Sequence, residues 1–163
     1  MVSFFQKILV SFSNIILSLP FTILGLARFE NDEIKADWQP PGYVFGIVWP
    51  ILYLLFAFIN LRIYDLKSLT QSKRNILINQ ALTESLVQTL WLLVSANYGG
   101  GRNLIQNFIG LLVMVSLVLY CYLVRIPSLK ENDFTSFILY LPYSAWISFA
   151  FILNLQIVIN YIK

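Results

Sequence analysis

The sequence contains no histidine and only one cysteine, Cys121. Without histidine there is no imidazole general base, no Cys–His nucleophile pair and no ordinary zinc site. A single cysteine cannot form a disulfide within the chain. Most of the common catalytic groups are therefore missing, and we expect neither a metal site nor a conventional set of catalytic residues.

Charge is also scarce: charged residues make up 12% of the 163 residues, whereas soluble proteins carry about a quarter. The 11 basic and 8 acidic residues lie mostly in short connecting stretches, and no basic block suited to nucleic acid occurs. Hydrophobic residues make up 58% of the chain, more than a single soluble core of this length can bury. We expect the surplus to face lipid, and nucleic acid is not an expected partner.

Long stretches without charge, interrupted only by Glu84, predict five transmembrane helices. A helix needs about 20 residues to cross a hydrocarbon core of about 30 Å, and backbone in lipid must satisfy its own hydrogen bonds. The connections are too short for a soluble domain, so we expect residues 1–163 to form one all-α integral membrane bundle. The predicted spans are residues 8–27, 38–61, 75–101, 103–124 and 134–162.

Three of these spans carry polar or aromatic residues at a spacing of three to four, which places them on one helix face. Because polar groups in hydrocarbon are costly, we expect these faces to point into the bundle. Interhelical packing and contact with a ligand both agree with this pattern. The residues are Phe45, Trp49, Tyr53, Phe56 and Asn60 in the second span, Gln80, Glu84, Gln88, Trp91 and Ser95 in the third, and Tyr143, Trp146, Ala150, Leu153 and Asn154 in the fifth.

The residues on these three helix faces favour a particular kind of ligand. Rigid rings beside a few amides favour a large, flat, hydrophobic ligand. Glu84 is a candidate functional group because it is a carboxylate inside a membrane span, and the alternative is a neutral or paired side chain. Pro142 indicates either a kink or a helix start.

The two remaining spans have plainer patterns. The fourth span, rich in Leu and Val, is interpreted as scaffold or dimer surface. The first span carries small and polar residues on one face, which favours close helix packing; they are Ser11, Asn14, Ser18, Thr22 and Gly25.

Two motifs resemble a known family. Residues 38–53 read Trp-Gln-Pro-Pro-Gly-Tyr-Val-Phe-Gly-Ile-Val-Trp-Pro-Ile-Leu-Tyr, and residues 141–150 read Leu-Pro-Tyr-Ser-Ala-Trp-Ile-Ser-Phe-Ala. Both resemble the signature of the TspO/MBR family, the tryptophan-rich sensory proteins and peripheral-type benzodiazepine receptors (translocator proteins). The resemblance implies a bundle of five transmembrane helices, usually dimeric, that binds tetrapyrroles and sterols in an aromatic cavity closed by the first loop.

The resemblance also implies where the ligand binds. In this chain Gln88 stands where the family usually has asparagine, Glu84 where glutamine is common, and Tyr43 where a tryptophan follows the proline pair. Affinity and ligand choice therefore depend on these departures. The residues that match the family's pocket are Trp38, Pro41, Phe45, Trp49, Tyr53, Tyr143, Trp146, Phe149, Ala150 and Asn154. The predicted ligand-binding set adds Glu84, Gln88 and Trp91 from the polar face of the third span.

Several functions follow. The leading hypothesis is binding of a porphyrin or sterol for transport, sequestration or stress sensing, with protoporphyrin as ligand and no required cofactor. The first alternative is a light- and oxygen-dependent porphyrin-degrading enzyme with Trp38 and Trp146 as photo-oxidation candidates. A second is a sterol or lipid carrier, for which residues 158–163 fit a generic sterol pattern. A third is a structural membrane protein whose aromatic faces only pack.

The absence of histidine also bears on the ligand. A bound haem would lack the common imidazole ligand, and only weaker ligands such as Cys121, Met114 or a tyrosine remain. Metal-free porphyrin therefore suits the sequence better. The expected partners are the lipid bilayer and a second copy of the chain, in a bacterial or an organellar outer membrane.

Overall fold

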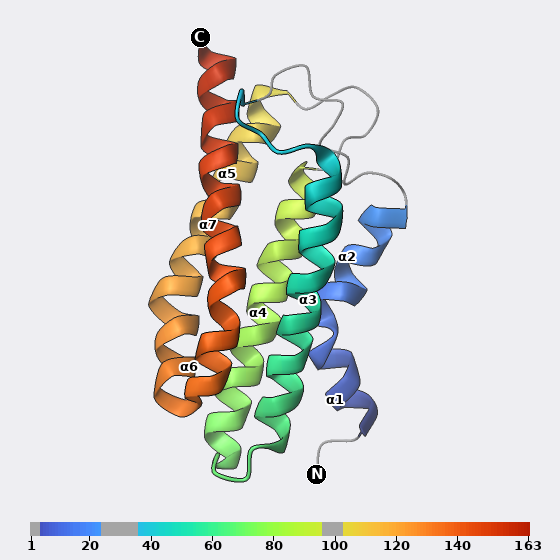
Figure 1. Cartoon of the computed structure of the whole chain (residues 1–163), viewed down its shortest axis with the longest axis vertical. Helices are drawn as coiled ribbons and strands as arrows, with labels where there is room; N and C mark the ends of the chain where they lie inside the picture. The colour runs from blue at the N-terminus through green and yellow to red at the C-terminus, as the bar shows by residue number, and fades with distance from the viewer. Residues whose placement is uncertain (1–3, 24–35, 96–102) are drawn as a thin grey trace.

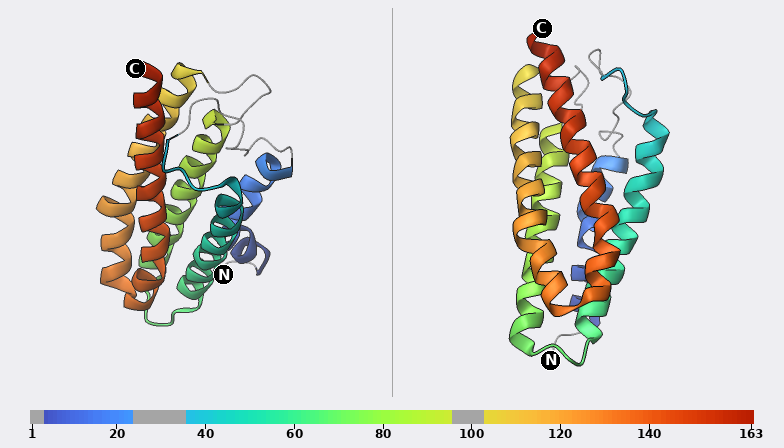
Figure 2. Two further views of the ribbon diagram at one scale, coloured as in Figure 1. Left: turned by 45° about the horizontal axis from the view of Figure 1, so that its top comes forward. Right: turned by 60° about the vertical axis from the view of Figure 1, so that its left-hand side comes forward.

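The computed structural model describes residues 4–23, 36–95 and 103–163, and it places them in helices joined by short connections, without a β-strand in these ranges. Figures 1 and 2 show the long helices side by side in one bundle. The all-α prediction is confirmed. In chain order the elements are α1 (Phe4–Ser11), α2 (Ser13–Ile23), α3 (Gly42–Asp65), α4 (Gln71–Ser95), α5 (Leu104–Tyr120), the π-helical segment η1 (Cys121–Arg125), α6 (Ile126–Asn132) and α7 (Phe134–Ile162).

Several of these helices are long and apolar enough to cross a membrane. Three of them qualify alone: α3, the continuous stretch Leu104–Asn132 and α7. The pair α1 and α2 counts as a fourth if its two parts, bent by 55°, form one span. The count of five spans stays a prediction, because α4 is 25 residues long but less apolar than the others.

Local side-chain bonds set where two of the long helices begin. The Asn103 side chain accepts a hydrogen bond from the Gln106 backbone N–H (2.8 Å), and the Gln106 side chain accepts one from the Asn103 N–H (3.1 Å), which forms a capping box for α5. The Asp133 carboxylate accepts from the Ser136 N–H at 3.2 Å and caps the start of α7. Both spans therefore start at the residues that can satisfy their first amides.

Three sequence predictions need correction. The predicted end of the fourth span at residue 124 is wrong, because the helix continues to Asn132, and Arg125, the charge that bounds the predicted span, is 0% exposed. The helix-start interpretation of Pro142 is wrong, since α7 begins at Phe134 and runs through the proline. The first predicted span breaks between α1 and α2, and its residues 24–27, including Gly25, lie outside the described ranges.

The predicted inward faces are confirmed. On α3 all five residues of the stripe are buried, and on α4 Glu84, Gln88 and Trp91 are buried. On α7 only Trp146 of the stripe is half-buried, and the others are buried. Ser11, Asn14 and Ser18 of the first span also face inward. Large apolar side chains such as Ile51, Leu86 and Ile152 are exposed on the outside, as expected of a surface in contact with lipid.

Candidate ligand-binding site

A cleft opens between α3, α4 and α7, at the end of the bundle where α3 begins. Its volume is about 310 Å³, including the part open to solvent. The connection that carries Trp38 crosses this end of the bundle before α3 starts (Figure 1). The wall is mostly apolar and aromatic, and its residues are Gln39, Phe45, Trp49, Trp91, Ala150, Leu153, Asn154 and Ile157.

Aromatic rings form a continuous cluster around this cleft. Trp49 lies 6.1 Å from Trp91 and 6.2 Å from Trp146, measured between ring centroids. Trp146 stacks on Phe149 at 5.0 Å, and Phe149 meets the edge of Trp38 at 5.8 Å. All four tryptophans of the chain therefore belong to one cluster, which extends from the exposed mouth to the buried wall.

The cluster follows from helix geometry. Phe45, Trp49 and Tyr53 are four residues apart, so they share one face of α3. Trp146 of α7 approaches Phe45 at 5.7 Å, which closes the aromatic wall between the two helices. Offset and edge-on ring pairs at such distances stabilise packing by about 0.5–1.5 kcal/mol each beyond the buried area.

The predicted binding residues fall into layers. Phe45, Trp49, Trp91, Ala150 and Asn154 line the cleft. Trp146 and Phe149 flank it through ring contacts, while Trp38 and Pro41 are exposed at its mouth.

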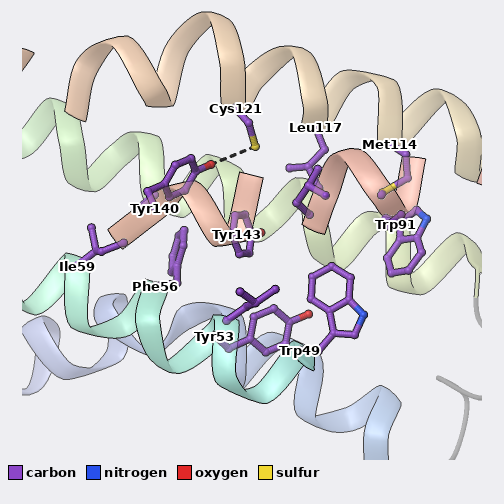
Figure 3. Packing of buried hydrophobic residues seen from close by; sticks show 14 of the residues in the cluster. Trp49, Tyr53, Phe56, Ile59, Trp91, Met114, Leu117, Cys121, Tyr140 and Tyr143 are labelled. Atoms are coloured by element: carbon purple, nitrogen blue, oxygen red, sulfur yellow. Dashed lines mark hydrogen bonds between the residues drawn. The ribbon is translucent and has the colours of Figure 1, made fainter. Parts of the chain in front are cut away.

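Tyr53, Gln88 and Tyr143 lie one layer deeper. Figure 3 shows Tyr53 beside Trp49 and Tyr143 across from Phe56. The Gln88 amide lies beside the Tyr53 hydroxyl. These polar side chains form the floor beneath the cleft, which the first loop is predicted to close from above; residues 24–35 of that loop lie outside the described ranges.

The sequence model of one family, TspO/MBR, matches residues 9–159, which is nearly the whole chain and includes both motifs. The chain belongs to the TspO/MBR family. Its membership and its apolar helices make it an integral, multi-pass membrane protein that contacts lipid. A search of curated proteins finds no match.

Glu84 lies apart from the cleft of this TspO/MBR member. It is 0% exposed, and its Oε2 faces Arg125 Nε at 3.4 Å. The Tyr140 hydroxyl donates a hydrogen bond to Glu84 Oε1, and the Cys121 thiol lies 3.6 Å from the same oxygen. The structure places Glu84 beside Arg125 and outside the cleft wall, and its contact with a ligand stays a prediction.

Sequence reasoning missed Arg125 and Tyr140. Arg125 follows 22 uncharged residues, so it resembled a charge at the membrane boundary. The available signal was Glu84, because an intramembrane carboxylate needs a partner of opposite charge or a proton. Cys121 was assigned to a scaffold helix, yet it points at Tyr140 from η1 (Figure 3). Gln39, Leu153 and Ile157 of the cleft wall were also absent from the predicted binding set.

Proposed function

We propose that this TspO/MBR member binds a flat, hydrophobic tetrapyrrole of the porphyrin class in the cleft between α3, α4 and α7, for transport, sequestration or stress sensing. The observation that supports this proposal is the continuous cluster of all four tryptophans around the cleft. Ring faces stack on a planar ligand, while Gln39 and Asn154 supply polar groups in the wall for its edge. A second copy of the chain is the protein partner that goes with this proposal.

The size of the cleft determines how a tetrapyrrole can enter it. Its 310 Å³ includes open solvent, and the enclosed room amounts to little more than one water molecule, far below the range of about 300–1,000 Å³ for ligand pockets. A tetrapyrrole therefore needs side chains at the mouth to move outward. Trp38, 46% exposed, and the half-buried Phe149 beside it are in the position to do so.

The wall favours a metal-free porphyrin over ligated haem. Soft or imidazole side chains hold haem iron in most haem proteins. Met114 and Cys121, the soft candidates in this chain, are both 0% exposed and do not belong to the wall. We expect free porphyrin and iron porphyrin to bind with similar affinity through their faces, without the absorption spectrum of strong axial ligation.

The proposal is tested by titrating protoporphyrin into the detergent-purified protein in the dark and following tryptophan fluorescence. Because every tryptophan belongs to the cluster, saturable quenching reports on the cleft. The decisive variant is Ala150→Leu, which fills the cleft from α7 and removes no reporter. Overpacking of about 1–3 kcal/mol corresponds to affinity that is weaker by about fivefold to about 150-fold.

The matched control is Ala145→Leu, which places the same side chain on the exposed face of the same helix. We expect it to bind like the unmodified chain. Equal affinities of the two variants, or quenching that does not saturate, would contradict the proposal and leave the fold and the family unaffected.

The porphyrin-degrading alternative also has support from a specific observation. Trp146 lies in ring contact with Phe45, Trp49 and Phe149, so it would touch a ligand that stacks in the cleft. Illumination of the bound sample in air tests it. A new absorbing product that disappears in Trp146→Phe would favour degradation, and an unchanged spectrum would favour binding alone.

A further inference from the structure

A second polar cluster lies deeper in the bundle, and the proposed ligand cleft does not use it. Its centre is the pair Glu84 and Arg125, both 0% exposed. Charged side chains are rare inside membrane bundles because burying them is costly, and those that occur mark sites of function. The cluster also sits on η1, a π-helical turn, which is an element found frequently at functional sites.

Arg125, the cation of this pair, has interaction partners other than Glu84. Arg125 Nη1 donates to the Leu77 carbonyl at 2.7 Å, and Nη2 donates to Asn60 Oδ1 at 3.1 Å. The guanidinium carbon also lies 5.9 Å from the ring centroids of Phe56 and Tyr140, within the range of cation–π attraction. Arginine keeps its charge in proteins, so Arg125 stays a cation in any state of its neighbour.

Glu84, the anion of the pair, has fewer hydrogen-bond donors around it than it can accept. An ionised carboxylate offers about four acceptor sites. Glu84 Oε1 accepts from the Tyr140 hydroxyl and lies near the Cys121 thiol, whereas Oε2 has no hydrogen bond and only the 3.4 Å ion pair. A proton on Oε2 would neutralise the carboxylate and leave Arg125 with its other partners. The pair is therefore asymmetric, and Glu84 is the member that changes its charge.

Two polar side chains lie between the level of Glu84 and the start of α4. Gln80 lies one turn earlier on the same face of α4 and is half-buried. Its Nε2 donates to the hydroxyl of half-buried Ser128 on α6 at 2.8 Å, and its Oε1 has no hydrogen-bond partner. An amide and a hydroxyl thus lie on the side of Glu84 that faces the end of the bundle where α4 begins.

We propose that Glu84 is a proton-binding site of this bundle, which takes up and releases a proton beside the permanent charge of Arg125. Proton uptake weakens the attraction between α4 and η1, and it removes the charge that the Tyr140 hydroxyl of α7 holds. Gln88 and Trp91 follow Glu84 on the same face of α4. The loss of charge at Glu84 and the weaker attraction between α4 and η1 therefore also affect the floor and the wall of the cleft. The site itself does not require the proposed ligand.

The other titratable groups near Glu84 belong to a different pH range. Those that face it from the described elements are Arg125 and Cys121 of η1, Tyr140 and Tyr143 of α7, and Tyr120 of α5, while α3 contributes the uncharged Asn60. Thiols and phenols ionise above about pH 8 and guanidinium groups above about pH 12. A proton bound in this cluster between about pH 5 and about pH 8 is therefore assigned to the carboxylate.

The test is infrared difference spectroscopy of the full chain in phosphatidylcholine vesicles without porphyrin, between about pH 8 and about pH 5. We expect the C=O stretch of a protonated carboxylic acid to grow reversibly as the pH falls. The band should be lost in Glu84→Gln and kept in Glu131→Gln, the matched control, because the Glu131 side chain is exposed.

A further variant keeps the test decisive if Glu84→Gln does not fold. Tyr140→Phe retains the acid but removes its hydrogen-bond donor, so the band at a given pH should be larger than in the unmodified chain. A band that is absent throughout this pH range, or one that is present and constant, would overturn the proposal, since Glu84 would then be permanently ionised or permanently protonated. None of these outcomes depends on porphyrin binding.

Discussion

Replacing Arg125 with methionine is the sharpest stability test of the buried pair. The substitution leaves the Leu77 carbonyl and Asn60 Oδ1 without their donor, and Glu84 without its counter-charge. A buried acceptor left unpaired costs about 1–3 kcal/mol, and breaking a buried ion pair from one side costs about 3–5 kcal/mol. We therefore expect a loss of about 3–5 kcal/mol in the free energy of unfolding. For a chain of this size that corresponds to a fall in Tm of roughly 6–20 °C.

The assay is thermal unfolding in detergent micelles, followed by circular dichroism, as a double-mutant cycle with Glu84→Met. The double variant leaves no uncompensated charge, so it should lose less stability than the two single variants together, with a coupling of about 1–3 kcal/mol. Lys73→Met is the control, because Lys73 pairs with Glu131 at 3.5 Å on the exposed surface, where a pair contributes about 0–1 kcal/mol. If Arg125→Met unfolds no earlier than this control, or if the cycle is additive, the ion pair does not stabilise the bundle.

Three further predictions concern the cap of α7 and two glycines. The guanidinium of Arg62 beside Asp133 lowers the pKa of that carboxyl below its ordinary value of 3.8. Because this pKa is lowered, Asp133 stabilises the chain above that pH, and the contribution disappears as the pH falls through the lowered pKa. Asp133→Asn should cost about 1 kcal/mol at neutral pH through the lost ion pair, because asparagine caps a helix about as well as aspartate, and the difference in chemical denaturation should shrink as the pH falls below 3.8. Gly46→Ala meets no atom within 4 Å and should raise Tm by a few degrees, since alanine favours a helix by about 1 kcal/mol over glycine. Gly110→Ala places its Cβ 3.1 Å from the Ser95 hydroxyl and should show a smaller gain or none in the same melting experiment.

Much of the bundle is predictable because lipid imposes a simple rule on helix faces. The spacing of Phe45, Trp49 and Tyr53 places them on one side of α3, and a side that carries polar or aromatic groups in a membrane helix turns inward. The same rule orients α4 and α7. Five residues predicted from sequence are found in the cleft wall because they occupy those inward faces of α3, α4 and α7.

Other features depend on long-range contacts that no local pattern reveals. Arg125 looked like a boundary because a single charge after an apolar stretch usually ends a span, and only its burial against Glu84 shows that the helix continues. No proline or glycine lies at the break between α1 and α2, so the sequence gives no local signal for it. In contrast, α3 and α7 continue through Pro50 and Pro142. Proline is therefore a poor guide to helix ends here, since the backbone groups it leaves without partners can be satisfied by neighbouring helices.

The position of α4 explains why its hydropathy is lower than that of the other long helices. α4 packs against α2, α3, α5, η1 and α6, so much of its surface faces protein and not lipid. Its inner face carries Glu84 and Gln88, while Leu86 and Leu90 on its outer face are exposed. The mean hydropathy over both faces is therefore lower than that of a helix that is apolar all round. That α4 crosses the membrane stays a prediction, and it agrees with these contacts because neighbouring helices can replace the water that its polar groups would otherwise need. α4 is also the element that carries both Trp91 of the cleft and Glu84 of the ion pair, so the proposed ligand site and the proposed proton site share one rigid helix, and a displacement of α4 at either site moves the other.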